Sequence, residues 1–238
     1  MSLWLKQLLL KLQAAAAGPS STAPLAWAAG KAAITLVLIW VGFSPRPAAA
    51  TDSQTFAAAS AQFLRATGGV DDAIEPAAAK FQQLSRAEPA DPVLRAYSGA
   101  ATAMRARTAV LPWHKLSHAE DGLAQIDKAL AQLTAAHDAP LYRGVPASLE
   151  ARFVAASCFL ALPTLFNRGP RGTQLLQAVL NSPLFDASPV AFRAAVWLRA
   201  GTEAADAHRN DEARAWLKKA AASAAPQAAA AQARLKEL

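Results

Sequence analysis

The residues best able to perform metal chemistry are histidines, and two of the four lie four positions apart. His114 and His118 could bind a transition metal if both lay on one face of a helix. Ser117 and Glu120 have the spacing of a capping box, which predicts that a helix begins at Ser117 and leaves His114 outside it. Spacing specifies no third ligand. The sequence therefore predicts no metal site and no cofactor.

Adjacent acidic residues could supply a general acid and base, and the chain contains three such pairs. They are Asp71-Asp72, Glu120-Asp121 and Asp211-Glu212. Each pair falls at a predicted helix start, where carboxylates cap amides and stabilise the helix dipole. Ser98 lacks the glycine that precedes a nucleophile elbow, and no glycine loop of a phosphate-binding type is present. The sequence predicts that the protein is not an enzyme.

Two arginines flank a Gly-Pro turn in the segment 166–172. Arg168 and Arg171 precede a helix that Thr173 is expected to cap. Guanidinium groups and free amides converging at a helix start can bind a phosphate or an acidic peptide. This pair is therefore a candidate anion site, and a solvated turn is the alternative.

Two further residues could carry partner binding or redox chemistry. Trp113, beside Lys115, is expected either to anchor a protein partner or to fold back over neighbouring helices. Cys158 is the only cysteine, so no intramolecular disulfide can form. Its apolar neighbours predict a buried, inert thiol, and an exposed reactive thiol is the alternative.

The elements that must position these residues are predicted to be helices. The chain is 53% hydrophobic, alanine dominates that fraction, and no run alternates in the manner of a strand. Start and stop signals divide the chain into helices at about 52–67, 71–88, 92–110, 117–136, 146–162, 173–182, 189–207 and 210–225, followed by a segment ending at Leu238. The prediction is one all-α domain over residues 51–238.

Residues 1–50 read as a signal peptide with a long amino-terminal region, which a wrongly assigned start codon would explain. The apolar run 32–43 is short for a membrane span, and Ala48 and Ala50 fit the cleavage pattern. These residues hold four basic side chains and no acid, so residues 51–238 carry 20 basic and 17 acidic residues. A net charge of +3 does not favour a nucleic-acid partner. Export to the periplasm is predicted, with an uncleaved inner-membrane anchor as the alternative.

Small and large apolar residues recur at a characteristic spacing in two stretches. In the first, Trp197, Gly201, Ala213, Leu217 and Ala220 match positions 4, 8, 20, 24 and 27 of a 34-residue motif, and the stretch resembles a tetratricopeptide repeat. In the second, Ala77, Phe81, Leu84, Pro89 and Gly99 match two successive repeats, and residues 122–130 resemble another second helix. The resemblance implies a solenoid of stacked antiparallel helix pairs. An irregular helical bundle is the alternative.

Tetratricopeptide repeats bind protein segments along a surface lined by the first helix of each pair. The residues that the resemblance places on that surface include Leu198, Thr202, Asp206, Ala96 and Met104. The resemblance implies a non-catalytic scaffold or adaptor that binds an apolar helix or chain terminus in an envelope assembly or transport complex. The alternative function is a carrier of a small molecule or lipid, held between helices by Arg168 and Arg171.

Overall fold

The computed structural model describes residues 51–238, and this part of the chain is helical without any strand. Its α-helices are α2 (Ser53–Thr67), α3 (Ile74–Ala87), α4 (Pro92–Thr108), α5 (Pro112–Ala131), α6 (Ala147–Ala161), α7 (Gly169–Leu180), α8 (Val190–Asp206), α9 (Asn210–Ala221) and α10 (Ala228–Lys236). The predicted all-α class is confirmed. The predicted signal peptide, residues 1–50, lies outside the described residues. Among the helices described, none combines the length and apolar character that a membrane crossing requires.

Most helix boundaries follow the caps that the sequence contains. The Asp52 carboxylate accepts a hydrogen bond of 2.7 Å from the amide of Thr55 at the start of α2. Asp91 accepts from the amides of Val93 and Leu94 at 2.8 and 3.0 Å at the start of α4. After α2 the backbone of Gly69 turns with a φ of 98°, which a residue with a side chain adopts only under strain. The predicted limits of these helices are confirmed within about two residues.

The predicted start of α5 at Ser117 is wrong. α5 begins at Pro112, because proline at the first helical position has a suitable φ and lacks an amide hydrogen that would need a partner. Ser117 therefore lies inside the helix, where its hydroxyl contacts the Asp121 carboxylate at 3.4 Å. The observed capping box follows α5, at Thr134 and His137.

Two other predicted caps are also wrong. α7 begins at Gly169, four residues before Thr173, whose hydroxyl donates to the Gly169 carbonyl at 3.4 Å. Before α8, Ser188 is followed by Pro189, a pair that predicts an N-cap with proline at the first helical position. Its hydroxyl instead donates backwards to the Leu184 carbonyl at 2.8 Å and does not cap the helix. In both cases the hydroxyl has a carbonyl four residues earlier within reach, which competes with capping.

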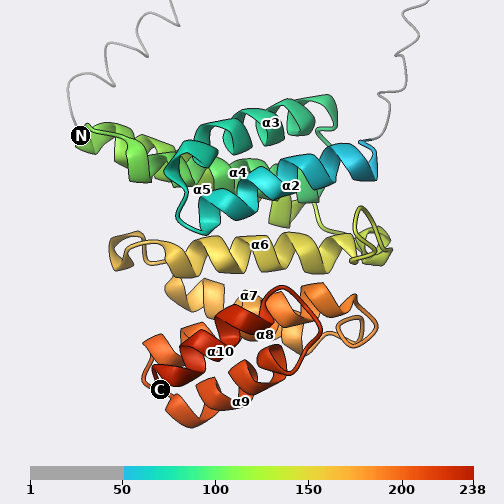
Figure 1. Ribbon diagram of the computed structural model, residues 1–238. Coiled ribbons are helices and arrows are strands. Elements are labelled where there is room, and N and C mark those ends of the chain that lie inside the picture. The colour runs from blue at the N-terminus through green and yellow to red at the C-terminus, as the bar shows by residue number, and fades with distance from the viewer. Residues whose placement is uncertain (1–50) are drawn as a thin grey trace, which may run out of the picture. The chain divides into compact units, whose positions relative to one another are not determined.

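The helices pack in consecutive pairs, α2 with α3, α4 with α5, α6 with α7 and α8 with α9 (Figure 1). α4 also packs against α3 and α6, and α10 covers part of α9 and α8. The second helix of every pair buries a small or medium residue, then a large one four positions on, then an apolar one three further on. These triplets are Ala77, Phe81 and Leu84; Gly122, Ile126 and Ala129; Gly172, Leu176 and Val179; and Ala213, Leu217 and Ala220.

Missing side chains allow the paired helices to approach closely. A Cβ atom on Gly122 would lie 2.5 Å from the Gly99 carbonyl oxygen, and one on Gly99 would lie 2.6 Å from the Gly122 oxygen. At the α8–α9 crossing, a Cβ on Gly201 would lie 2.6 Å from Cγ of Leu217. Contacts this short cannot accommodate a methyl group, so glycine fixes where each pair crosses.

The α4–α5 pair extends further beyond its crossing than the α8–α9 pair. Gly99 and Gly122 are 23 positions apart, whereas Gly201 and Ala213, which contact each other at the other crossing, are 12 apart. The difference of 11 residues is close to three helical turns of 3.6 residues each. Because the additional length is close to a whole number of turns, the same faces of the two helices remain in contact. In Figure 1 the free end of this pair reaches beyond α2 and α3.

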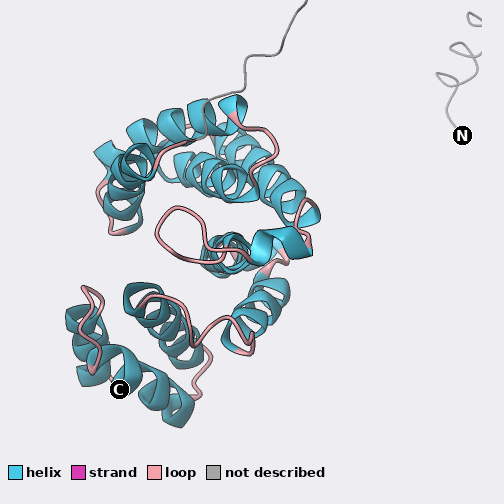
Figure 2. Ribbon diagram, turned by 90° about the vertical axis from the view of Figure 1, so that its right-hand side faces the viewer, coloured by secondary structure: helices cyan, strands magenta, loops and turns pink. Residues whose placement is uncertain are grey.

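The loop between α5 and α6 covers one end of the helices, and Figure 2 looks onto that end. Tyr142 from this loop stacks on Phe56 of α2, with ring centroids 4.1 Å apart. Arg143 pairs with Glu150 of α6 and donates to the Tyr97 hydroxyl at 2.8 Å. The Tyr97 hydroxyl donates to Glu150 at 3.0 Å, and Glu150 is fully buried. The loop is thus fixed by aromatic stacking and by a buried polar cluster.

Tyr97 and Tyr142 are the only tyrosines in the chain, and both should resist ionisation in the folded protein. Burial raises the pKa of Tyr97 above its usual range, and the Glu150 carboxylate adds to the effect. Burial and the Asp91 carboxylate raise the pKa of Tyr142. A raised folded-state pKa gives stability that is present below about pH 10 and is lost as the pH rises further.

An alkaline titration followed by tyrosinate absorbance tests this. The folded protein should show no ionisation near pH 10, and both tyrosines should ionise together when the fold is lost. In denaturant both should titrate near the usual value of about 10. Ionisation of either tyrosine near pH 10 with the helical signal intact would contradict the packing of the loop.

Candidate interaction site

Exposed apolar side chains concentrate at the free end of the α4–α5 pair. We call residues 109–118 the α4–α5 tip. The exposed fractions are 88% for Val110, 39% for Leu111, 62% for Trp113 and 45% for Leu116. In the described part of the chain, the five other exposed large apolar residues lie in different elements: Leu64, Val70, Leu141, Leu165 and Val190. Single exposed apolar residues are ordinary, whereas a cluster indicates a contact surface.

The end of α4 is held firmly just before the tip. Arg105 forms an ion pair with Glu75 of α3, with its Nε 2.9 Å from a carboxylate oxygen. Arg107 pairs with Asp71 at 2.5 Å and donates to the Ala66 carbonyl at 2.8 Å. These contacts fix α4 against the α2–α3 connection. The tip therefore projects from an anchored base.

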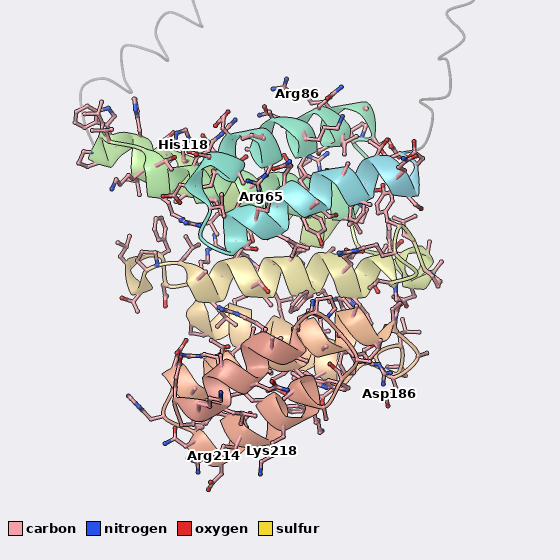
Figure 3. All side chains as sticks on the ribbon, viewed as in Figure 1. Arg65, Arg86, His118, Asp186, Arg214 and Lys218 are labelled. Carbon is pink, nitrogen blue, oxygen red and sulfur yellow. The ribbon has the colours of Figure 1, made fainter. Side chains whose placement is uncertain are left out.

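His114 and His118 both lie in α5, so the expectation that His114 lies outside the helix is wrong. Their ring centroids are 6.4 Å apart, and the ring of Trp113 lies edge-on to His114 at 6.1 Å. Figure 3 labels His118 at this end of the molecule. Over residues 51–238, no three His, Cys, Asp or Glu side chains are grouped so that they could hold a metal. The pair adds two polar imidazole rings to the apolar tip.

Charges around the tip are of both signs. Lys115 is exposed, and Glu120 and Asp121 are exposed on the next turn of α5. The arginines at the base of the tip are already paired with acids, as described above. The surface therefore offers apolar side chains within a mixed polar rim, which resembles the anatomy of a protein–protein interface.

The structure does not bring the predicted groove residues together. Ala96 is fully buried in the core, and Met104 packs on the cluster that contains Ile74. Leu198 packs against Leu217 and the C-terminal helix, and the Asp206 carboxylate pairs with Arg234 of α10 at 3.2 Å. The Thr202 hydroxyl donates to the Leu198 carbonyl at 2.9 Å. These residues do not form one open surface. Trp113 and Lys115 lie instead at the tip.

The predicted anion site is partly neutralised by an acid from α5. Arg168 donates to the two Asp127 oxygens at 3.3 and 3.0 Å, and Arg171 donates to one of them at 2.5 Å. Both guanidinium groups also lie 5.4 Å from the ring centroid of Phe159. Two cations share one carboxylate, so one positive charge remains. Anion binding at this cluster stays a prediction.

Cys158 is partly buried against the core. Burial raises the pKa of its thiol to about 12, and the nearby Arg199 opposes this effect weakly. Because the thiolate is the reactive and metal-binding form, a raised pKa disfavours reaction of this thiol at neutral pH. The predicted inert thiol is consistent with this position.

Sequence reasoning identified Trp113 and Lys115 but missed Val110, Leu111 and Leu116. The apolar residues around Pro112 were a signal for an exposed contact surface. Because the start of α5 was predicted at Ser117, these residues were interpreted as part of a loop. Comparisons of this sequence with protein-family models, with curated proteins and with solved structures gave no match.

Proposed function

We propose that this chain is a non-catalytic scaffold or adaptor with a tetratricopeptide-like stack of helix pairs, and that the α4–α5 tip docks a protein partner. The observation that carries the docking proposal is the cluster of Val110, Leu111, Trp113 and Leu116 on a projecting element. We further propose that residues 1–50 direct export to the periplasm, where the domain acts within an envelope assembly or transport complex. An uncleaved anchor would keep the domain on the periplasmic face of the inner membrane.

The repeated burial in the second helices supports the repeat-like stack. Four helices that differ in sequence bury the same pattern of small, large and apolar positions. In both the α4–α5 and the α8–α9 pair, a glycine of the first helix contacts the large residue of the second helix. These contacts are Gly99 with Ile126 and Gly201 with Leu217. In a stack of repeats each pair buries its apolar face on its neighbours.

The extra length of the α4–α5 pair supports docking at its tip. The α4–α5 pair has about three more helical turns beyond its crossing than the α8–α9 pair, and the α8–α9 pair packs without them. Those turns nevertheless carry a 62% exposed tryptophan, a residue that is enriched where partner proteins bind most strongly. An exposed apolar cluster has a free-energy cost in water unless another surface covers it.

The chemistry of the tip favours a protein over a membrane surface as the occupant. Peripheral binding to anionic lipid uses basic residues around the apolar group. Around this tip the acids Glu75, Asp71, Glu120 and Asp121 accompany the basic residues Arg105, Arg107 and Lys115. The partner is expected to present an apolar cleft with a polar rim that receives Trp113.

Site-specific photocrosslinking of the full chain in its source cells tests the proposal. A photoreactive amino acid at Val110 or Lys115 leaves Trp113 in place and should crosslink one and the same protein. The same probe at Leu165 or Leu64, which are exposed apolar positions elsewhere, should not capture that protein. Adducts only to lipid, only to a second copy of this chain, or equally from all four positions would contradict docking at the tip.

A further inference from the structure

A hollow lined by polar and cationic side chains lies near the crossing of α4 and α5, and none of its lining residues belongs to the α4–α5 tip. It has a volume of about 420 Å³ and lies between α3, α4 and α5. Its lining comprises Gln82, Ser85, Arg86, Pro89, Arg95, Ser98 and Gln125. No acidic residue lines it.

Arg95 is held in place by neutral acceptors. Its Nε donates to the Gln132 side chain at 2.9 Å, and its Nη2 donates to the Pro89 carbonyl at 2.6 Å. Gln132 donates to the same carbonyl at 3.0 Å. Within residues 51–238 no carboxylate pairs with Arg95 or Arg86. By contrast, Arg105 and Arg107 at the base of the tip, Arg143 of the loop, and Arg168 and Arg171 beside Asp127 are all paired. The positive charge at this hollow is therefore not neutralised.

Two of the lining side chains, Ser98 and Gln125, belong to a hydrogen-bonding network. The Ser98 hydroxyl donates to the Gln125 side chain at 2.8 Å, and Gln125 donates to the Thr102 hydroxyl at 3.4 Å. Ser98 and Thr102 are buried and Gln125 is partly buried, so the network is largely shielded from water. Arg86 is exposed at the rim, and Figure 3 shows it extending outward from α3. Arg95 is held in one position by its hydrogen bonds, and the exposed Arg86 side chain at the rim has no such bonds to any described residue. Both guanidinium groups are therefore available to contact an anionic group.

We propose that this hollow binds a small molecule through a phosphate or carboxylate group, with Arg95 and Arg86 as its cationic contacts. Arginine presents parallel N–H donors that match the oxygens of both groups, and the amides and hydroxyls offer further hydrogen bonds. The site is separate from the α4–α5 tip. Ligand binding here and partner docking there are independent properties.

Titration calorimetry with two probes, inorganic phosphate and citrate, tests the site at constant ionic strength with chloride as the baseline. The unmodified protein should bind at least one probe saturably, and the stronger probe identifies the anionic group. Arg95→Gln should weaken that binding at least about tenfold, since hydrogen bonds to charged groups contribute about 1.5–3 kcal/mol and each 1.4 kcal/mol is a factor of ten. Arg65→Gln, on an exposed arginine of α2 outside the lining, should leave binding unchanged.

Because Arg95 also holds Pro89 and Gln132, Arg86→Gln serves as a second variant that removes only an exposed side chain. It should retain the melting temperature of the unmodified protein and bind the probe several-fold more weakly. The absence of saturable binding of either probe would overturn the proposal. So would equal binding by the unmodified protein, Arg95→Gln and Arg86→Gln. The photocrosslinking test at the α4–α5 tip should give the same product in Arg95→Gln and Arg86→Gln as in the unmodified protein. A loss of anion binding in these variants would then be independent of partner docking.

Discussion

Gly122→Ala is expected to lower the free energy of unfolding by about 3 kcal/mol or more, the upper part of the range for overpacking. The new Cβ would lie 2.5 Å from the Gly99 carbonyl oxygen and 2.7 Å from the amide nitrogen of Ala103. Both atoms belong to the backbone of α4, so only a shift of a whole helix can relieve the clash. Alanine otherwise favours helices, so the loss cannot arise from helix propensity. Denaturant unfolding followed by circular dichroism measures the change.

Two other glycines provide matched controls. A Cβ on Gly169, at the start of α7, would meet nothing within 4 Å, so Gly169→Ala should be neutral or stabilise by up to about 1 kcal/mol. Gly201→Ala should have an intermediate cost, because the closest atom belongs to the Leu217 side chain and not to the backbone. If Gly122→Ala were as stable as Gly169→Ala, the α4 and α5 backbones would not be in contact at this crossing.

Glu150→Ala is expected to lower the free energy of unfolding by about 3 kcal/mol, the lower end for breaking a buried ion pair. Removal of this fully buried carboxylate leaves the Arg143 guanidinium and the Tyr97 hydroxyl without their acceptor. The Arg143 side chain remains 40% exposed, so water compensates for part of the loss. The loop between α5 and α6 should also exchange its amide hydrogens faster, because Arg143 ties it to α6.

The matched control is Glu120→Ala, which removes an exposed carboxylate from a helix without a described ion pair. It should change the free energy of unfolding by less than about 0.5 kcal/mol. Glu150→Gln should fall between the two, because its side-chain oxygen can still accept one hydrogen bond. Equal stability of Glu150→Ala and Glu120→Ala would show that the buried cluster does not hold the loop.

Much of the fold could be predicted from the sequence because its helix signals are local. Asp52 and Asp91 cap helices through amides two or three residues away, and Gly69 ends α2 through its own φ. The failures at Ser117 and Thr173 have a shared cause. A hydroxyl that suits a cap also suits the interior of a helix, where it bonds within one turn, and neighbouring prolines decided both starts.

The site was less predictable because it depends on pairing between helices. In the 34-residue motif the two small residues that meet at the crossing are 12 positions apart, whereas Gly99 and Gly122 are 23 apart. The sequence pattern therefore does not reveal that these two glycines meet. Only when this contact is known do Val110 to Leu116 stand out as additional length on a projecting end. The hollow near Arg95 is a similar case, since its lining comes from three helices and a connection with no local motif. Predicted groove residues such as Leu198 were covered by α10, a contact that the repeat pattern does not encode.

The most direct test of docking at the α4–α5 tip is the affinity of the crosslinked partner, once purified, for the unmodified protein, Trp113→Ala and Leu165→Ala. Both side chains are largely exposed, so neither substitution should alter stability by more than about 0.5 kcal/mol. Trp113→Ala is predicted to weaken binding by about 2 kcal/mol, roughly 30-fold, and Leu165→Ala to leave it unchanged within about twofold. Equal affinity of all three proteins for the partner would contradict a docking role for the tip.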